Sequence, residues 1–245
     1  MDYRKRCYEN YLTTHWNYSH TLSKKEYELF AKVSKKRFKN ILPTDKRAKI
    51  IDVACGAGHF LYFIQNQGYT NTKGIDLSLE QLDAAQKVGV KNLQRVDLFE
   101  YLPKHEEKFD MVIANDIIEH LTKEETMTFL DLLYSSLLPG GKVLISTING
   151  QAMFSPAIRY CDFTHEQGFT PGSLSQVMRV CGFKNVCVYG EYPVAHDFRS
   201  TVRGGLWWCI VKLLQFYNLI ARGAGRGLWK RNNIFEPRIF AIGKK

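Results

Sequence analysis

The stretch Lys49-Ile50-Ile51-Asp52-Val53-Ala54-Cys55-Gly56-Ala57-Gly58 decides the fold of this chain. Its apolar run predicts a buried strand, and the glycines that follow predict a tight turn into a helix over residues 58–67. Glycines let the backbone pass close to a ligand, and free amide groups at a helix start favour anionic or polar groups. The stretch therefore predicts a strand, turn and helix that bind a ligand.

Short apolar runs alternate with amphipathic segments through the middle of the chain, as is typical of a doubly wound α/β sheet. Further strands are expected over residues 72–76, 92–96, 109–114, 142–148, 184–189 and 238–242. Helices are expected over residues 78–88, 122–138 and 173–181. We therefore predict an α/β fold with a Rossmann-like, seven-stranded sheet.

Two pieces of the chain lie outside this alternation. Residues 1–48 combine an aromatic-rich stretch with a basic helix over residues 24–42, and they are expected to form an N-terminal helical lid. Residues 49–245 are expected to form the main domain, with a helical insertion at 191–236 before the last strand. A strongly apolar helix is predicted within this insertion, over residues 206–221.

Composition narrows the class of protein. The 245 residues have an ordinary hydrophobic content of 45%, which excludes disordered and fibrous classes. There is neither an apolar run long enough to span a membrane nor a secretory signal pattern at the N-terminus. The six cysteines lack the spacing of a zinc site or a disulfide framework, which favours reduced thiols. We expect a cytoplasmic protein.

The net charge of +10 is unevenly distributed along the chain. Residues 1–50 carry 13 basic and 5 acidic side chains, and residues 191–245 carry 10 and 3, whereas residues 51–190 carry 11 and 16. Because nucleic-acid enzymes usually place positive potential beside their chemistry, the acidic middle argues against a nucleic-acid partner. Basic flanks fit anionic substrates, anionic lipid or simple solubility equally well.

An acidic residue ends the second predicted strand. Asp76 follows Gly56 by 20 positions, a spacing that suits a carboxylate accepting both hydroxyls of a ribose. A dinucleotide fingerprint needs a third glycine, and Leu61 stands at that position. The pattern therefore disfavours NAD.

Five segments in register resemble the class I S-adenosylmethionine-dependent methyltransferases. They cover roughly residues 49–190 and are Asp52-Val53-Ala54-Cys55-Gly56-Ala57-Gly58, Asp76-Leu77, Val96-Asp97-Leu98, the run from Phe109 to Leu121 that ends Glu119-His120-Leu121, and Leu138-Pro139-Gly140-Gly141. The segment from Asp162 to Phe183 more loosely resembles small-molecule O-methyltransferases of bacterial surface-polysaccharide (capsule and lipopolysaccharide) biosynthesis.

The resemblance implies S-adenosylmethionine as cofactor. It assigns the ribose to Asp76, the adenine to Leu77 and the adenine amino group to Asp97. The cofactor-binding residues that it implies are Asp52, Ala54, Cys55, Gly56, Gly58, Phe60, Asp76, Leu77, Asp97, Leu98, Asn115 and Ile117. Asp52 is equally suited to holding the glycine loop in shape, and Cys55 is expected to be a packing residue.

Methyl transfer to a hydroxyl calls for a base, and histidine is the natural choice near neutral pH. His120 and His165 are the main candidates, with Asp116 as a group that could orient the base. His15 and His20 of the aromatic stretch are alternatives, and no metal is expected.

The insertion also bears on partners. Its predicted helix has aromatic residues and basic ends, which suits peripheral contact with the inner membrane, a homodimer interface or packing on the domain. The favoured acceptor is a sugar or nucleotide-linked sugar hydroxyl, or a group such as a phosphoramidate attached to it. Alternatives are a membrane-associated prenylated quinone or another small molecule as acceptor and, from another class, an RNA- or partner-binding protein with a vestigial cofactor fold.

Overall fold

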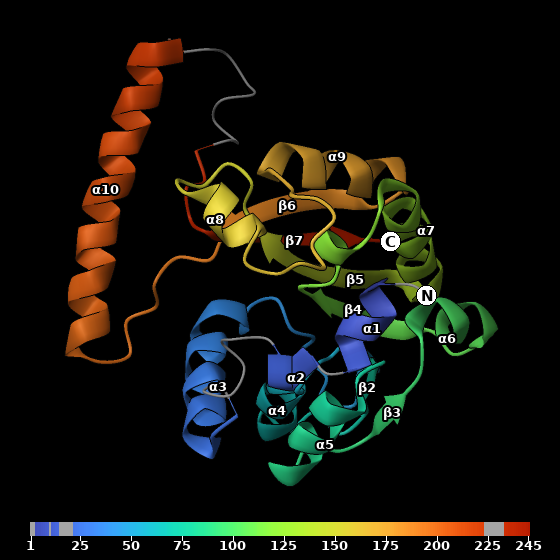
Figure 1. Ribbon diagram of the computed structural model, residues 1–245. Helices are drawn as coiled ribbons and strands as arrows, with labels where there is room; N and C mark the ends of the chain where they lie inside the picture. Colours follow the sequence, from blue (N-terminus) through green and yellow to red (C-terminus); the bar gives the residue numbers. More distant parts are fainter. Residues whose placement is uncertain (1–2, 10, 15–21, 223–232) are drawn as a thin grey trace.

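The computed structural model describes residues 3–9, 11–14, 22–222 and 233–245, and its elements surround one sheet (Figure 1). The strands are β1 (Ile50–Val53), β2 (Thr72–Asp76), β3 (Leu93–Arg95), β4 (Phe109–Asn115), β5 (Leu137–Ile148), β6 (Lys184–Gly190) and β7 (Arg238–Lys244). Their order is β3-β2-β1-β4-β5-β7-β6, with β7 antiparallel to both of its neighbours. The predicted seven-stranded, doubly wound sheet is confirmed.

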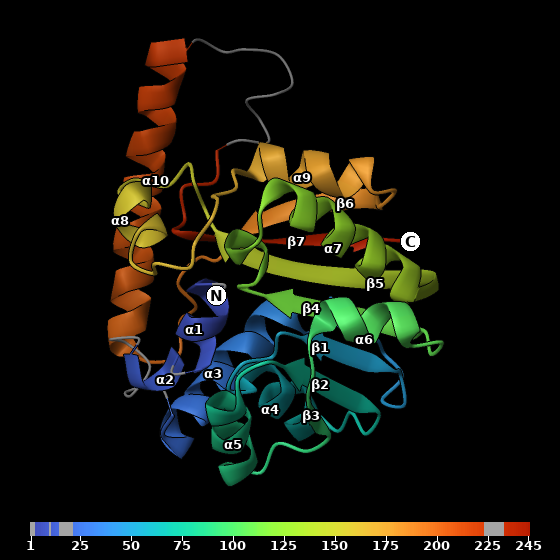
Figure 2. The same cartoon turned by 45° about the vertical axis from the view of Figure 1, so that its right-hand side comes forward.

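Helices cover both faces of this sheet (Figures 1 and 2). They are α1 (Tyr3–Glu9), α2 (Tyr11–Thr14), α3 (Lys24–Phe38), α4 (His59–Asn66), α5 (Leu79–Lys87), α6 (Leu98–Lys104), α7 (Lys123–Ser136), α8 (Ser155–Arg159), α9 (Pro171–Val180) and α10 (Phe198–Arg222). A 3-10 turn, Ile118–His120, follows β4. No helix in the described ranges is long and apolar enough to cross a membrane.

Two hydrophobic cores lie on opposite sides of the sheet because successive strand residues point to opposite faces. Ile50 of β1 packs in the core that includes side chains of α3, α4 and α5. Its neighbour Ile51 packs in the other core, with side chains of α6, α7 and α9. All four residues of β1 are buried, as expected for a central strand of a parallel sheet.

The structure differs from the prediction in several elements. β5 begins at Leu137 instead of residue 142, because Leu137 already pairs with Phe109 across a register irregularity. The helix α6 was not predicted, and the carboxylate of Asp97 caps its start by accepting a hydrogen bond from the Phe99 amide at 2.8 Å. The helix α10 begins at Phe198, eight residues before the predicted start, in a turn where Asp197 accepts a bond from the Ser200 amide at 2.7 Å.

Candidate functional site

A cavity of about 580 Å³ opens at the carboxyl ends of β1, β2 and β4. In doubly wound sheets this edge is where ligands bind. The N-terminal helices contribute Tyr8 and Tyr11 to the lining, and it also includes Glu191, where the insertion begins, and Arg238, the first residue of β7. The cavity therefore collects side chains from the whole length of the chain.

The N-terminal helices are tied to the domain by charged and polar contacts. Arg4 of α1 makes a two-point ion pair with Glu125 of α7, with both N–O distances at 2.6 Å. Tyr11 donates a hydrogen bond to Asp162, and the ring of Tyr8 lies 6.2 Å from that of His120. These contacts place α1 and α2 against the cavity, and their role as a lid stays a prediction. The predicted alternatives His15 and His20 lie outside the described residues.

The glycine loop between β1 and α4 has the left-handed conformation that its sequence favours. Gly56 and Gly58 have φ angles of 53° and 72°, and Ala54 also has a positive φ of 53°. A Cβ atom on Gly58 would meet the Cβ of Ala85 at 3.0 Å, so glycine is needed there for both conformation and packing. The hydroxyl of Tyr27, on α3, donates to the Ala57 carbonyl at 2.6 Å and supports the loop from behind.

Asp76 connects this loop to the second strand. Its two carboxylate oxygens accept hydrogen bonds from the amides of Gly56 and Ser78, each at 2.8 Å. Each carboxylate oxygen has more than one lone pair, so both can still accept a ligand hydroxyl. Burial raises the pKa of Asp76, and its backbone hydrogen bonds oppose this shift.

Asp52 is a buried carboxylate at the end of β1. Its side chain lines the cavity, and its Oδ1 has no hydrogen-bond partner among the described residues. Burial, with a smaller contribution from Asp76, raises its pKa well above the usual range. Because an unpartnered buried oxygen costs free energy, this geometry fits a ligand that donates a hydrogen bond to Asp52.

The structure brings most of the predicted site residues to the cavity wall. Those implied for the cofactor that line it are Asp52, Ala54, Cys55, Gly56, Phe60, Asp76, Leu77, Leu98, Asn115 and Ile117. The catalytic candidates Asp116, His120 and His165 line it as well. Gly58 and Asp97 do not: Gly58 is packed against α5, and Asp97 caps α6.

A network of charged side chains lies on the side of the cavity away from Asp76 and the glycine loop. Arg238, the first residue of β7, contacts both carboxylate oxygens of Asp116 at 2.6 Å. It also lies 3.6 Å from Glu191, which in turn pairs with Arg37 of α3 at 2.9 Å. Asp116 was predicted to orient a base, but the structure commits its carboxylate to Arg238.

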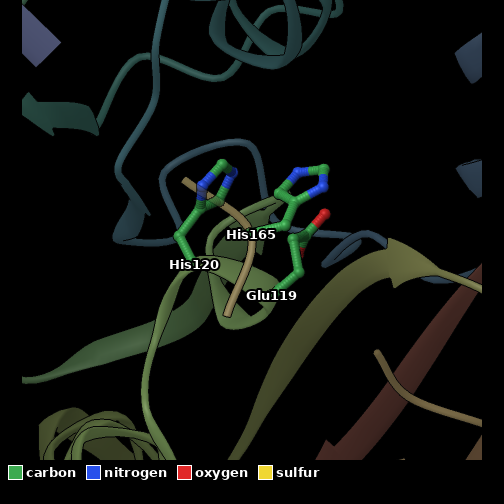
Figure 3. Close-up of side chains that lie close together, drawn as sticks. All are labelled: Glu119, His120 and His165. Carbon is green, nitrogen blue, oxygen red and sulfur yellow. The ribbon is translucent and has the colours of Figure 1, made fainter. Parts of the chain in front are cut away.

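Glu119, His120 and His165 lie close together beside this network of charged side chains (Figure 3). Thr164 donates its hydroxyl proton to Asp162, so its oxygen accepts from His120 Nδ1 at 2.8 Å. His165 Nδ1 donates to the Arg159 carbonyl at 2.7 Å. Since each Nδ1 carries the proton, each Nε2 keeps a lone pair.

The environment of these groups shifts their protonation. Burial, with His165 nearby, lowers the pKa of His120 to about 4, so His120 is neutral at physiological pH. Burial and then Asp116 raise the pKa of Glu119 to about 8, so Glu119 is protonated at neutral pH. The hydroxyl of Thr147 donates a hydrogen bond to Oε2 of Glu119 at 2.8 Å.

The same three side chains also have the donor types of a metal site. One ligand atom from each of Glu119, His120 and His165 lies within 4.8 Å of the others. Two imidazoles anchored through Nδ1 and one carboxylate could hold a divalent ion. The expectation of a site without metal stays a prediction.

Several functional candidates were not identified from the sequence. Glu119 was noted only as part of a motif, and its complete burial gave no sequence signal. Arg238 and Arg37 lie far from the motif region in the chain, and only the folded structure places them beside Asp116 and Glu191. Tyr8 had a signal in the aromatic-rich N-terminal stretch, which was interpreted as a lid.

Comparison with known proteins shows the family. Residues 23–188 match the model of a methyltransferase domain family, and the chain belongs to that family. It is 32% identical over 108 residues to a ubiquinone biosynthesis O-methyltransferase from Psychrobacter cryohalolentis, with 41% of each chain covered. It is 28% identical over 158 residues to a tRNA U34 carboxymethyltransferase from Vibrio campbellii, covering 60% of this chain and 48% of the relative. The chain thus spans less than half the length of these relatives.

A solved structure agrees with the fold. A methyltransferase from Archaeoglobus fulgidus, described as S-adenosylmethionine-dependent, superposes with a TM-score of 0.64 at 24% identity, covering 88% of this chain and 94% of its own. These matches agree with the expected class I methyltransferase and its cofactor. None of the three names a surface polysaccharide, so that part of the resemblance stays a prediction.

Proposed function

We propose that this chain transfers a methyl group from S-adenosylmethionine to a hydroxyl of a sugar or a nucleotide-linked sugar, or to an oxygen of a group such as a phosphoramidate attached to it. The observation that carries the proposal is the pair of anchored histidines, His120 and His165, on the wall of the same cavity as Asp76 and the glycine loop. A cofactor subsite and a proton acceptor therefore share one cavity.

The residues present fit the cofactor. Asp76 offers two carboxylate oxygens to the ribose hydroxyls while its amide contacts hold it in place. The unpartnered Oδ1 of Asp52 suits the ammonium group of the methionine part, which donates hydrogen bonds. Binding of a cation beside Asp52 would also favour its ionised form. Leu77 and Leu98 supply apolar walls for the adenine.

When bound, the cofactor supplies a methyl group on a positively charged sulfur, and a hydroxyl acceptor must give up its proton as it is methylated. We assign acceptance of that proton to His165 Nε2, because the His165 tautomer is fixed by the Arg159 carbonyl. The pKa of His120 is lowered to about 4, so His120 is a poor base. Its lone pair positions the acceptor hydroxyl instead.

The charged half of the cavity supports a polyhydroxylated acceptor. Asp116, Arg238, Glu191 and Arg37 present donors and acceptors in alternation. The Nε of Arg37 is buried and has no hydrogen-bond partner within the described ranges, so it is suited to a hydroxyl or phosphate oxygen. Tyr8 and Tyr11 add aromatic surface at the opening.

A prenylated quinone is the second candidate acceptor. It is favoured by the similarity to a ubiquinone biosynthesis O-methyltransferase and by apolar lining residues such as Phe30, Ile148 and Ile158. Both candidates share the cofactor subsite and the histidines, so they differ only in the acceptor that is methylated.

The first test is calorimetric titration of the purified chain with S-adenosylhomocysteine. We expect micromolar binding that Asp76→Ala abolishes and that Asp83→Ala, an exposed carboxylate on α5, leaves unchanged. If Asp76→Ala binds as tightly as the wild type, the assignment of the cofactor subsite is wrong.

The second test is methyl transfer to nucleotide-sugars, glycan fragments and a demethylated quinone. His165→Asn is expected to lower kcat by about 10² or more with cofactor affinity unchanged, and His120→Asn to lower it less. Methylation of the quinone alone would select the second candidate. Equal kcat values for wild type and His165→Asn would remove His165 as the base.

A further inference from the structure

The helix α10 stands apart from the domain along most of its 25 residues (Figures 1 and 2). A stripe of apolar side chains faces outward, with the sequence steps four, four, three, four, three and four. Its members, all exposed, are Phe198, Val202, Leu206, Cys209, Leu213, Phe216 and Ile220. Leu213 and Ile220 are 68% and 69% exposed, which is unusual for side chains of this size in a soluble domain.

The apolar surface is wider than this stripe. Trp208 and Leu219 extend it on one side, and Ile210 and Tyr217 extend it on the other, all of them exposed. At 3.6 residues per turn, these positions cover an arc of about 200°. The less exposed positions, such as Trp207 and Asn218, lie on the opposite side, where the Trp207 ring nitrogen approaches Glu236 at 3.5 Å.

The charge of this region has one sign only. No acidic residue occurs between positions 198 and 235, whereas seven basic residues do: Arg199, Arg203, Lys212, Arg222, Arg226, Lys230 and Arg231. Arg199, Arg203 and Lys212 are exposed on α10 itself. Such a surface is complementary to an anionic partner with an extended apolar layer.

These observations favour a membrane over a second copy of the chain as the partner of this helix face. A helix pair buries a narrow seam and matches flanking charges of opposite sign. Here the apolar arc is too wide for such a seam, and a second copy would bring basic residues against basic residues. An interfacial helix has a broad apolar face, aromatic residues and basic side chains that reach the lipid headgroups.

We propose that the outward face of α10 binds the surface of a membrane that contains anionic lipids, with the helix lying in the headgroup region. Lys212 projects from within the apolar arc, with its ammonium group 5.6 Å from the Trp208 ring. Its long side chain lets the ammonium group reach the headgroups while the stem stays on apolar surface.

This contact positions the cavity as well as the helix. The insertion that carries α10 begins and ends beside Glu191 and Arg238, both of which line the cavity. The connecting segment is held on α3, where Lys36 donates to the Ala195 carbonyl at 2.6 Å and Arg37 to the Tyr192 carbonyl at 2.9 Å. A membrane-bound α10 therefore keeps the cavity near the lipid surface, whichever acceptor it takes.

The test is co-sedimentation of the full chain with vesicles of phosphatidylcholine alone or with 30% phosphatidylglycerol. We expect binding to the anionic vesicles that weakens as salt is raised. Replacing Leu213 and Phe216 together with serine should weaken this binding at least tenfold, because both lose apolar burial. Replacing Gln215 and Asn218 with serine introduces the same residues on the other side of the helix and should leave it unchanged.

A charge variant tests the second part of the argument. Arg199→Gln with Arg203→Gln is expected to weaken binding to the anionic vesicles about 25-fold, at about fivefold per charge, with no effect on neutral vesicles. Circular dichroism and S-adenosylhomocysteine titration confirm that each variant is folded, independently of vesicle binding.

Three outcomes would overturn the proposal. The first is no sedimentation of the wild type with anionic vesicles at low salt. The second is unchanged vesicle binding by the double serine variant at Leu213 and Phe216. The third is a dimer in light scattering, without vesicle binding, that this double variant dissociates; α10 would then be an interface between two copies of the chain.

Discussion

Replacing Glu119 with glutamine should change how the stability of the protein depends on pH. The pKa of Glu119 is raised to about 8, first by burial and then by Asp116. The unfolded chain releases this proton near the ordinary value of 4.5, whereas the native site retains it up to about pH 8. The free energy of unfolding therefore falls as pH rises through this interval, because the native state binds more protons than the unfolded state.

The size of the effect follows from the interval that is measured. Each pH unit within it corresponds to about 1.4 kcal/mol for one proton, so Glu119 contributes a fall of about 2 kcal/mol between pH 6.5 and 8. The interval starts at 6.5 because His120, with its pKa lowered to about 4, changes stability only below the ordinary histidine value. Glu119→Gln retains an oxygen that accepts from Thr147 but carries no titrating proton.

Urea unfolding of the ligand-free protein at pH 6.5, 7.25 and 8 measures the difference. The stability of Glu119→Gln should fall less steeply than that of the wild type, by about 2 kcal/mol across the interval. Glu124→Gln removes an exposed carboxylate from the neighbouring helix α7 and should parallel the wild type. Parallel curves for Glu119→Gln and the wild type would refute a proton held on Glu119 at neutral pH.

Two further predictions concern the lid and the glycine loop. Arg4→Ala removes the two-point ion pair with Glu125 and should speed amide hydrogen exchange over residues 3–14 by about fivefold, whereas Arg6→Ala, exposed on the same helix, should not. Equal exchange in both variants would contradict this role for Arg4. Gly58→Ala should lower the free energy of unfolding by about 1–2 kcal/mol, because an alanine at a φ of 72° is strained. A further loss is expected because the new Cβ would lie 3.0 Å from the Cβ of Ala85. Gly89→Ala has a comparable φ of 93° with no atom within 4 Å of its Cβ, so urea unfolding that ranks the two variants equally would exclude the packing cost.

The sequence predicted the sheet and the glycine-loop side of the cavity because both depend on local patterns. A strand, a glycine turn and a helix are adjacent in the chain, so Asp52 and Gly56 could be placed from their order alone. Asp76 ends the next strand at the same edge of the sheet, and its side chain accepts a hydrogen bond from the Gly56 amide. Asp97 was likewise expected at the end of a strand, but its carboxylate caps the helix α6, which was not predicted.

The charged side of the cavity around Arg238 could not be predicted because its contacts join distant parts of the chain. Arg238 meets Asp116 across 122 residues, and only the antiparallel pairing of β7 with β5 brings Arg238 opposite Ile148 and so to the cavity. This contact also influences the chemistry of the site: Asp116 raises the pKa of Glu119 and Arg238 lowers it. Removing the positive charge of Arg238 would leave Asp116 unpaired beside Glu119 and strengthen the hold on the Glu119 proton. The last strand of the chain thus sets the protonation of a side chain in the motif after β4, which no reading of that motif alone could show.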